Sequence, residues 1–256
     1  MISIVNTPNF TGVTIRGDYY DLYNLVQALY EIAISEFSEK HQEYIDMSLR
    51  VLSVCYDIRH AFMAHRDIYL VDNNMTEEKM KWHSLIVPKT NVYYSCNCLY
   101  PEMFYLMLVL NDLVKLRIKD MTKSKDVYVG ALNGKAVWDE TIAVIRQFQA
   151  AFAKCVKETL APATYTRWLN LMNQNYIGLD EMLFQYLDRL NIEFIKMSRE
   201  RRAKSVFTMA RRIAEFRTDP EYQIMERAVF DAAKEHGWHP EEVHFVDDEY
   251  PEEWEW

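Results

Sequence analysis

The chain has few of the residues that interrupt helices, with only six glycines and seven prolines among its 256 residues. Half of its residues are apolar and 14% are aromatic, which is ample material for a sizeable core. The abundance of Leu, Ala and Met favours helices. This composition excludes a turn-rich all-β architecture and a disordered chain. We therefore expect a folded protein in which helices predominate.

Long hydrophobic runs are also missing. The longest, from Met103 to Leu110, stops well short of the roughly 20 residues that span a bilayer. The N-terminal segment Met1 to Asn6 has neither a basic leader nor the apolar core of a signal peptide. We expect no transmembrane helix, no membrane partner and a cytoplasmic location.

Cysteine is scarce, and the four thiols at Cys55, Cys96, Cys98 and Cys155 fit a reducing compartment. Cys96 and Cys98 stand two apart in a strand-like segment, so they point to one face and could be half of a metal site. The sequence offers no second Cys or His pair at zinc-type spacing. We interpret these cysteines as small buried hydrophobic residues and expect neither a metal ion nor another cofactor.

Charge is distributed unevenly. Residues 235–256 hold nine acidic side chains and no Lys or Arg, which accounts for the formal net charge of −9. The segment Arg199 to Arg217 holds seven basic residues against Glu200 and Glu215. Such a basic helix can bind nucleic-acid phosphates, hold the acidic tail or be a solvated surface. The predicted phosphate-binding residues are Arg199, Arg201, Arg202, Lys204, Arg211 and Arg212. The tail is expected to lie on that helix or to dock on a protein partner, with Trp254 and Trp256 as apolar anchors.

Periodicity divides the chain into an α+β half and an all-α half. Short strands are predicted at 2–5, 13–16, 67–71 and 91–97, with the first two forming a hairpin. Helices are predicted at 18–38, 46–64, 77–82 and 101–118. The first begins with a capping box of Asp18 and Asp21, and Thr76 caps the third. Beyond the polar stretch 119–125, helices are predicted at 135–160, 163–175, 180–198, 200–216 and 220–236, the last of them ended by Gly237. We therefore predict an α+β domain at 1–129, a helical domain at 130–237 and an acidic aromatic tail at 238–256.

The most informative segment runs from Tyr56 to Arg66. An apolar stripe with helical spacing keeps one face of the 46–64 helix pointing inward and consists of Ile45, Leu49, Leu52, Tyr56, Arg59 and Met63. Arg59 stands where an apolar residue is expected. A buried guanidinium keeps its charge, so it requires a carboxylate partner, a phosphate ligand or a water-filled cleft.

The pattern Arg59-His60-x4-His65 resembles the signature of the HEPN ribonucleases, all-helical RNA-cutting domains of toxin–antitoxin and phage-defence systems. The resemblance implies metal-independent cleavage of RNA, with Arg59 holding the scissile phosphate, His65 acting as general acid or base, and His60 assisting. It also implies a homodimer, in which two protomers join their motifs in one cleft. The residue types suit this chemistry, because an imidazole with a pKa of about 6.5 can take or give a proton at cellular pH.

A second resemblance concerns the segments 6–15, 17–23 and 55–61, which look like a bacterial family of unknown function. It implies no mechanism.

Two alternatives stay open. Arg59 could close a buried ion pair while His65 is an ordinary cation at the end of a helix. The chain could also be a non-catalytic protein-binding module, whose helical half and acidic tail engage a partner. The position of His65 discriminates between them: a His65 facing Arg59 across a cleft or a two-fold interface supports catalysis, and a solvent-facing or core-locked His65 supports binding.

Overall fold

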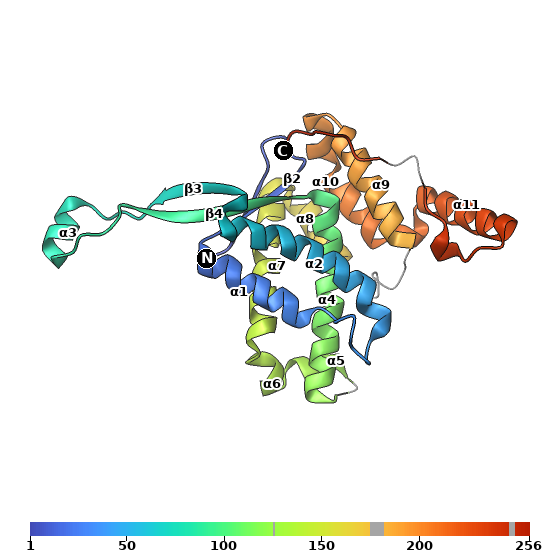
Figure 1. The fold of residues 1–256 in the computed structure, drawn as a ribbon, viewed down its shortest axis with the longest axis horizontal. Coiled ribbons are helices and arrows are strands. Elements are labelled where there is room, and N and C mark those ends of the chain that lie inside the picture. The colour runs from blue at the N-terminus through green and yellow to red at the C-terminus, as the bar shows by residue number, and fades with distance from the viewer. Residues whose placement is uncertain (125, 175–181, 246–248) are drawn as a thin grey trace.

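The computed structural model of the chain describes residues 1–124, 126–174, 182–245 and 249–256. Its fold is α+β and predominantly helical, which confirms the predicted class (Figure 1). The strands β1 (Ser3–Asn6), β2 (Gly12–Gly17), β3 (Asp67–Asp72) and β4 (Thr90–Leu99) form an antiparallel sheet in the order β1-β2-β4-β3.

The sheet buries one face against helices. The predicted hairpin of β1 and β2 is present, and Ile4, Ile15 and Cys96 lie opposite one another on the buried face of adjacent strands. Gly12 permits the close approach of β2 to β4, because a Cβ at this position would lie 1.9 Å from the carbonyl oxygen of Cys98. Alternate residues of β1, β2 and β4 therefore point to the same buried face of the sheet.

The first half of the chain supplies the helices next to the sheet. They are α1 (Tyr19–Ile32), α2 (Ile45–His60), α3 (Glu77–His83) and α4 (Tyr100–Thr122). The predicted capping box at the start of α1 is present, because Asp18 accepts from the backbone N–H of Asp21 and Asp21 accepts from that of Asp18. Helix α1 ends at Ile32, earlier than the predicted end at residue 38.

The second half adds α5 (Val127–Ala131), α6 (Gly134–Val137), α7 (Glu140–Thr159), α8 (Pro162–Leu171), α9 (Met182–Lys196), α10 (Arg199–Ala214) and α11 (Pro220–His236). The helix predicted at 135–160 is divided between α6 and α7, because Asp139 caps a new helix with its side chain. The short helices α5 and α6 lie where a domain boundary was predicted. The predicted end of one helix at residue 175 and the predicted start of the next at residue 180 lie outside the described residues.

One hydrophobic core includes residues from both halves of the chain, from Ile2 to Met225. Helix α7 packs on α1 and β1, and α10 packs on α4. The division into domains at residue 129 stays a prediction, but the buried side chains on its two sides are in contact. No helix in the described ranges is both long and apolar enough to cross a membrane.

Strands β3 and β4 continue past the helices as a two-stranded ribbon that carries α3 at its tip (Figure 1). We call residues 67–94 the arm. None of the arm's side chains is buried. Figure 1 shows the arm and α2 extending in opposite directions from the turn that joins them.

Candidate functional site

Helix α2 has two apolar faces. The sequence predicted that the face with Arg59 points inward, but the structure buries the other face. The predicted inward stripe is half-buried or exposed, with Leu49 43%, Tyr56 50% and Met63 50% accessible. The buried face consists instead of Met47, Val51, Val54, Cys55 and Ile58. This second face packs against α1 and α4. The inward direction predicted for the Arg59 stripe was therefore wrong, since spacing alone cannot tell which of two apolar faces finds a partner.

The two histidines of the motif are brought together by an irregular helix end. The α-helix ends at His60, and a π-helical turn, η2 (Ala61–His65), follows it. Ala64 adopts a left-handed conformation with φ of 63°, which terminates the turn. A π turn places residue i over residue i+5. The Nδ1 atoms of His60 and His65 accordingly lie 3.0 Å apart.

Arg59 does not meet His65. Its guanidinium lies 5.5 Å from the centre of the Tyr56 ring, and an Nη atom donates to the hydroxyl of Tyr30 at 3.5 Å. Within the described ranges no carboxylate pairs with Arg59, and its Nε is buried without a hydrogen-bond partner. The alternative of a buried ion pair is therefore wrong for this part of the chain. Arg59 is a half-buried cation that keeps unused capacity to bind an anion.

A second arginine and an aromatic ring complete the surroundings of the histidines. Arg66 pairs with Asp57 at 2.8 Å, and the His60 ring lies against Tyr56 with centroids 4.1 Å apart. Loss of hydration, followed by the influence of His65, Arg66 and Arg59, lowers the pKa of His60 below its ordinary value. The lowered pKa favours the neutral ring of His60.

The predicted phosphate-binding helix corresponds to α10, but two of its arginines are used inside the molecule. Arg202 is buried and donates to the carbonyl oxygens of Phe194, Ile195 and Asn9 and to the hydroxyl of Thr11. Arg212 pairs with three carboxylates, those of Glu193, Asp219 and Glu221. The predicted phosphate-binding role of Arg202 and Arg212 is therefore corrected to a structural one. Their guanidinium groups are already engaged in these contacts and are not free to bind a phosphate.

The other basic residues of α10 stay a predicted nucleic-acid surface. Arg201, Lys204 and Arg211 are exposed. Arg199 is partly used, since it donates to the carbonyl oxygen of Pro8 and lies over the Phe10 ring. Helix α10 packs on α4 and α8.

The acidic tail lies on α9 and on the loop between β1 and β2. The backbone of Val243 accepts from Gln185, and the hydroxyl of Tyr250 contacts Asp188 and Asn191. Near its end, the carbonyl oxygens of Glu255 and Trp256 accept from Thr11 and Asn9. The prediction that the tail lies along the basic helix was therefore wrong.

The tail tryptophans pack within the chain. Trp254 and Trp256 are half-buried, with ring centroids 5.8 Å apart, and Trp254 also contacts Tyr250. Their role as anchors for a protein partner stays a prediction, since both rings pack on their own chain but remain partly exposed.

The cysteines are buried and carry free thiols. Cys96 and Cys98 lie on the core face of β4, and burial raises the pKa of the Cys96 thiol to about 12. A thiol held neutral in this way is a poor metal ligand. Among the described residues, no group of three or more His, Cys, Asp or Glu side chains could hold a metal ion.

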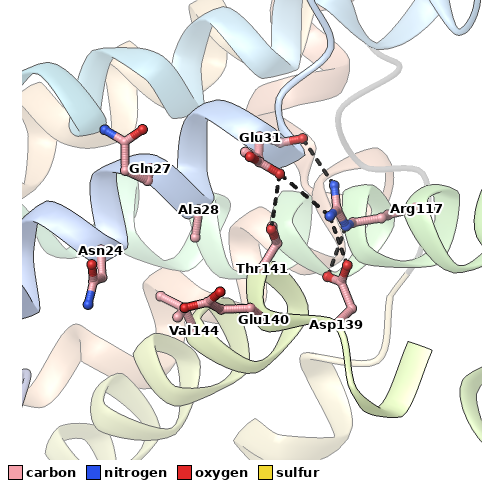
Figure 2. Close-up of a pocket in the computed structure, with 9 residues that line it drawn as sticks. All are labelled: Asn24, Gln27, Ala28, Glu31, Arg117, Asp139, Glu140, Thr141 and Val144. Carbon is pink, nitrogen blue, oxygen red and sulfur yellow. Dashed lines mark hydrogen bonds and ion pairs between the residues drawn. The ribbon is translucent and has the colours of Figure 1, made fainter. Parts of the chain in front are cut away.

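A polar pocket of about 380 Å³ lies between α1, α4 and α7 (Figure 2). Arg117 forms a two-pronged ion pair with Asp139 at 2.9 and 2.8 Å and donates to the backbone of Glu31. Thr141 donates to the carboxylate of Glu31. Arg117, Asp139, Glu31 and Thr141 thus satisfy one another and join three helices, while Asn24, Gln27 and Glu140 also line the pocket.

Comparisons with known proteins identify a family. Residues 2–256 match a family described as a domain of unknown function (DUF6904). The chain belongs to the DUF6904 family. No curated protein and no solved structure matches it. The DUF6904 description names no reaction, ligand or partner.

Sequence reasoning missed part of the environment of the histidines in this DUF6904 chain. Tyr30 and Tyr56 contact Arg59, and Tyr56 also contacts His60. Arg66 donates to the carbonyl oxygen of His65 and pairs with Asp57. None of these contacts was predicted. Tyr56 and Arg66 are close in sequence to Arg59 and His65, so their positions were a signal for these two contacts. Tyr30 lies on another helix, and only tertiary packing brings it to Arg59.

Proposed function

We propose that the chain is a metal-independent RNA endonuclease, with Arg59 as phosphate anchor and His60 and His65 as the proton-transferring pair. The observation that carries this proposal is the 3.0 Å contact between two accessible histidines, beside an arginine that no described carboxylate neutralises. The resemblance to HEPN ribonucleases supports the same roles and suggests an effector of a bacterial toxin–antitoxin or phage-defence system.

The proposed reaction transfers two protons. The ribose 2′-oxygen attacks the adjacent phosphorus, and the bond from phosphorus to the 5′-oxygen breaks. His60, whose lowered pKa favours the neutral ring, takes the proton of the 2′-hydroxyl. His65 gives a proton to the departing 5′-oxygen. Arg59 stabilises the negative charge that develops on the phosphate. The products are a 2′,3′-cyclic phosphate and a 5′-hydroxyl.

The mutual position of Arg59 and His65 suggests that the complete site needs two copies. Arg59 contacts Tyr30 and Tyr56 in its own chain, and His65 contacts His60. A second protomer could present its Arg59 to the histidine pair. The exposed stripe on α2 gives such a dimer an apolar surface.

The test is cleavage of a labelled single-stranded RNA in the presence of EDTA. We expect 2′,3′-cyclic phosphate ends, and a loss of rate by a factor of roughly 10² to 10⁴ in His65→Ala and in His60→Ala. His244→Ala is the matched control, because His244 is also exposed but lies in the C-terminal segment. Full activity in both motif variants, or a magnesium requirement with 5′-phosphate products, would overturn the proposal.

A non-catalytic protein-binding role is the alternative, and two observations favour it. His65 is exposed to solvent, and the arm carries uncovered apolar side chains. Absence of any RNA cleavage by a folded, dimeric protein would support this alternative.

A further inference from the structure

The arm exposes an apolar face that is a continuation of the core face of the sheet. In an antiparallel pair, residues directly opposite each other lie on the same face. Ile68 lies opposite Tyr94, and Leu70 lies opposite Val92, in line with the buried Cys96 and Cys98. Closer to the helices this face is covered. On the arm it is open, and Leu70 is 65% accessible.

The opposite face of the same ribbon is different. Tyr69 and Tyr93 lie across from each other there, and Arg16 stacks on Tyr69. Val71 lies opposite Asn91 and is only 36% accessible. This face also carries the polar residues Asp67, Ser95 and Asn91, so it is less apolar than the face of Ile68, Leu70 and Val92.

The tip of the arm adds further uncovered apolar groups. Trp82, Leu85 and Ile86 are exposed, with Ile86 fully accessible. A two-stranded ribbon without a core of its own is only marginally stable in water. An apolar surface of this extent on a projecting ribbon is typical of a site where another surface binds.

A matching surface lies at the other side of the turn that joins α2 to the arm. The outward stripe of α2 presents Leu49, Tyr56 and Met63, and Tyr30 of α1 is exposed beside it. Figure 1 shows α2 and the arm extending away from this turn in opposite directions. A two-fold axis near η2 would lay the arm of each copy along the α2 of the other. Both apolar surfaces would then be covered at once, in a closed and self-complementary contact.

The exposed area fits such a dimer. At about 200 Å² for a large side chain, Ile68, Leu70 and Val92 with Leu49, Tyr56 and Met63 offer roughly 600 Å² per protomer. The tip residues Trp82, Leu85 and Ile86 add roughly 450 Å², so the contact includes the tip. A stable interface needs about 800 Å² per partner.

We propose that the arm clasps a second copy of this chain, with the apolar face of Ile68, Leu70 and Val92 packed on the outward face of the partner's α2. This inference concerns assembly and does not depend on RNA cleavage. The partner's arm would also lie beside the histidine pair, because η2 connects α2 to the arm.

The first test measures the mass of the full-length protein in solution at micromolar concentration by light scattering. We expect a dimer of the 30.5 kDa chain. Leu70→Glu should give a monomer, because it places a charge in the apolar contact. Val71→Glu is the matched control on the adjacent residue of the same strand, and it should leave the dimer intact. Far-UV circular dichroism should show that both variants are folded.

The second test maps the contact. A photo-reactive phenylalanine analogue at position 70 should cross-link to the peptide that contains Tyr56, and mixed heavy- and light-isotope protein should show that the link joins two chains. A monomeric wild-type protein, an open-ended oligomer, or a dimer that Leu70→Glu leaves intact would overturn the proposal. RNA cleavage by a monomer would overturn the clasp and the two-copy site, while leaving the proton-transfer roles of His60 and His65 in place. A clasped dimer that does not cleave RNA would support the clasp and overturn the proposed reaction.

Discussion

At the scale of the residue, Arg202 shows how an arginine can be buried without an ion pair. It donates to the last carbonyl groups of α9, at Phe194 and Ile195, and ties them to the loop between β1 and β2 through Asn9 and Thr11. Carbonyl groups at the end of a helix lack partners within that helix, and the negative end of its dipole favours a cation. Arg202 therefore serves as the C-terminal cap of α9.

We expect Arg202→Ala to lower the free energy of unfolding by about 3 kcal/mol, because it leaves several buried carbonyl groups without donors. Arg201→Ala is the control from the same helical turn. Arg201 is exposed, so its replacement should change the free energy of unfolding by no more than about 0.5 kcal/mol. Urea denaturation of both variants checks this. Equal losses would show that the hydrogen bonds of Arg202 contribute little.

At the scale of the element, the junction of α1, α4 and α7 depends on Asp139. This carboxylate caps α7 by accepting from the backbone N–H of Ile142, and it pairs with Arg117 of α4. Burial pushes the pKa of Asp139 upward, but the hydrogen bonds from Arg117 and Ile142 outweigh it and leave the pKa below its usual range. The ionised form is thus favoured more in the folded protein than in the unfolded chain.

Because the folded pKa is depressed, the contribution of Asp139 to stability is present above the unfolded pKa of about 3.9 and is lost as the pH falls through the folded value. We expect Asp139→Asn, which keeps a capping oxygen but removes the charge, to lose about 1 to 2 kcal/mol at pH 7. Asp139→Ala should lose about 1 kcal/mol more, since it also removes the cap. In chemical denaturation the gap between wild type and Asp139→Asn should narrow below pH 4. A gap that does not change with pH would contradict the ion pair.

Element boundaries show where prediction from sequence succeeded. The capping box of α1, the Thr76 cap of α3 and the Gly237 stop of α11 were all visible as local patterns, and each is present. The left-handed Ala64 and the π turn before it were not visible. Alanine has no local preference for that conformation, so the packing around η2 must impose it.

At the scale of the whole molecule, the continuity of the core bears on folding. Side chains from α7, α9 and α10 pack in the same cluster as those of β2, α1 and α4. A domain that folds alone requires its own core. We therefore expect one cooperative unfolding transition for the full chain.

Calorimetry checks this, together with tryptophan fluorescence and circular dichroism as independent probes. Coincident midpoints and equal calorimetric and van't Hoff enthalpies are expected. Two separate transitions would instead support independent domains divided near residue 129.

The sequence by itself determined the helical α+β class, most helix starts and stops, the first hairpin and the position of the candidate motif. These depend on local periodicity and capping, which act over a few residues. Tertiary structure alone decided which face of α2 is buried, that Arg202 and Arg212 are used internally, that the tail lies on α9, and that the arm stands free of the core. Each of these depends on a competition between surfaces far apart in the chain, and the amount of apolar area that each packing buries selects the outcome.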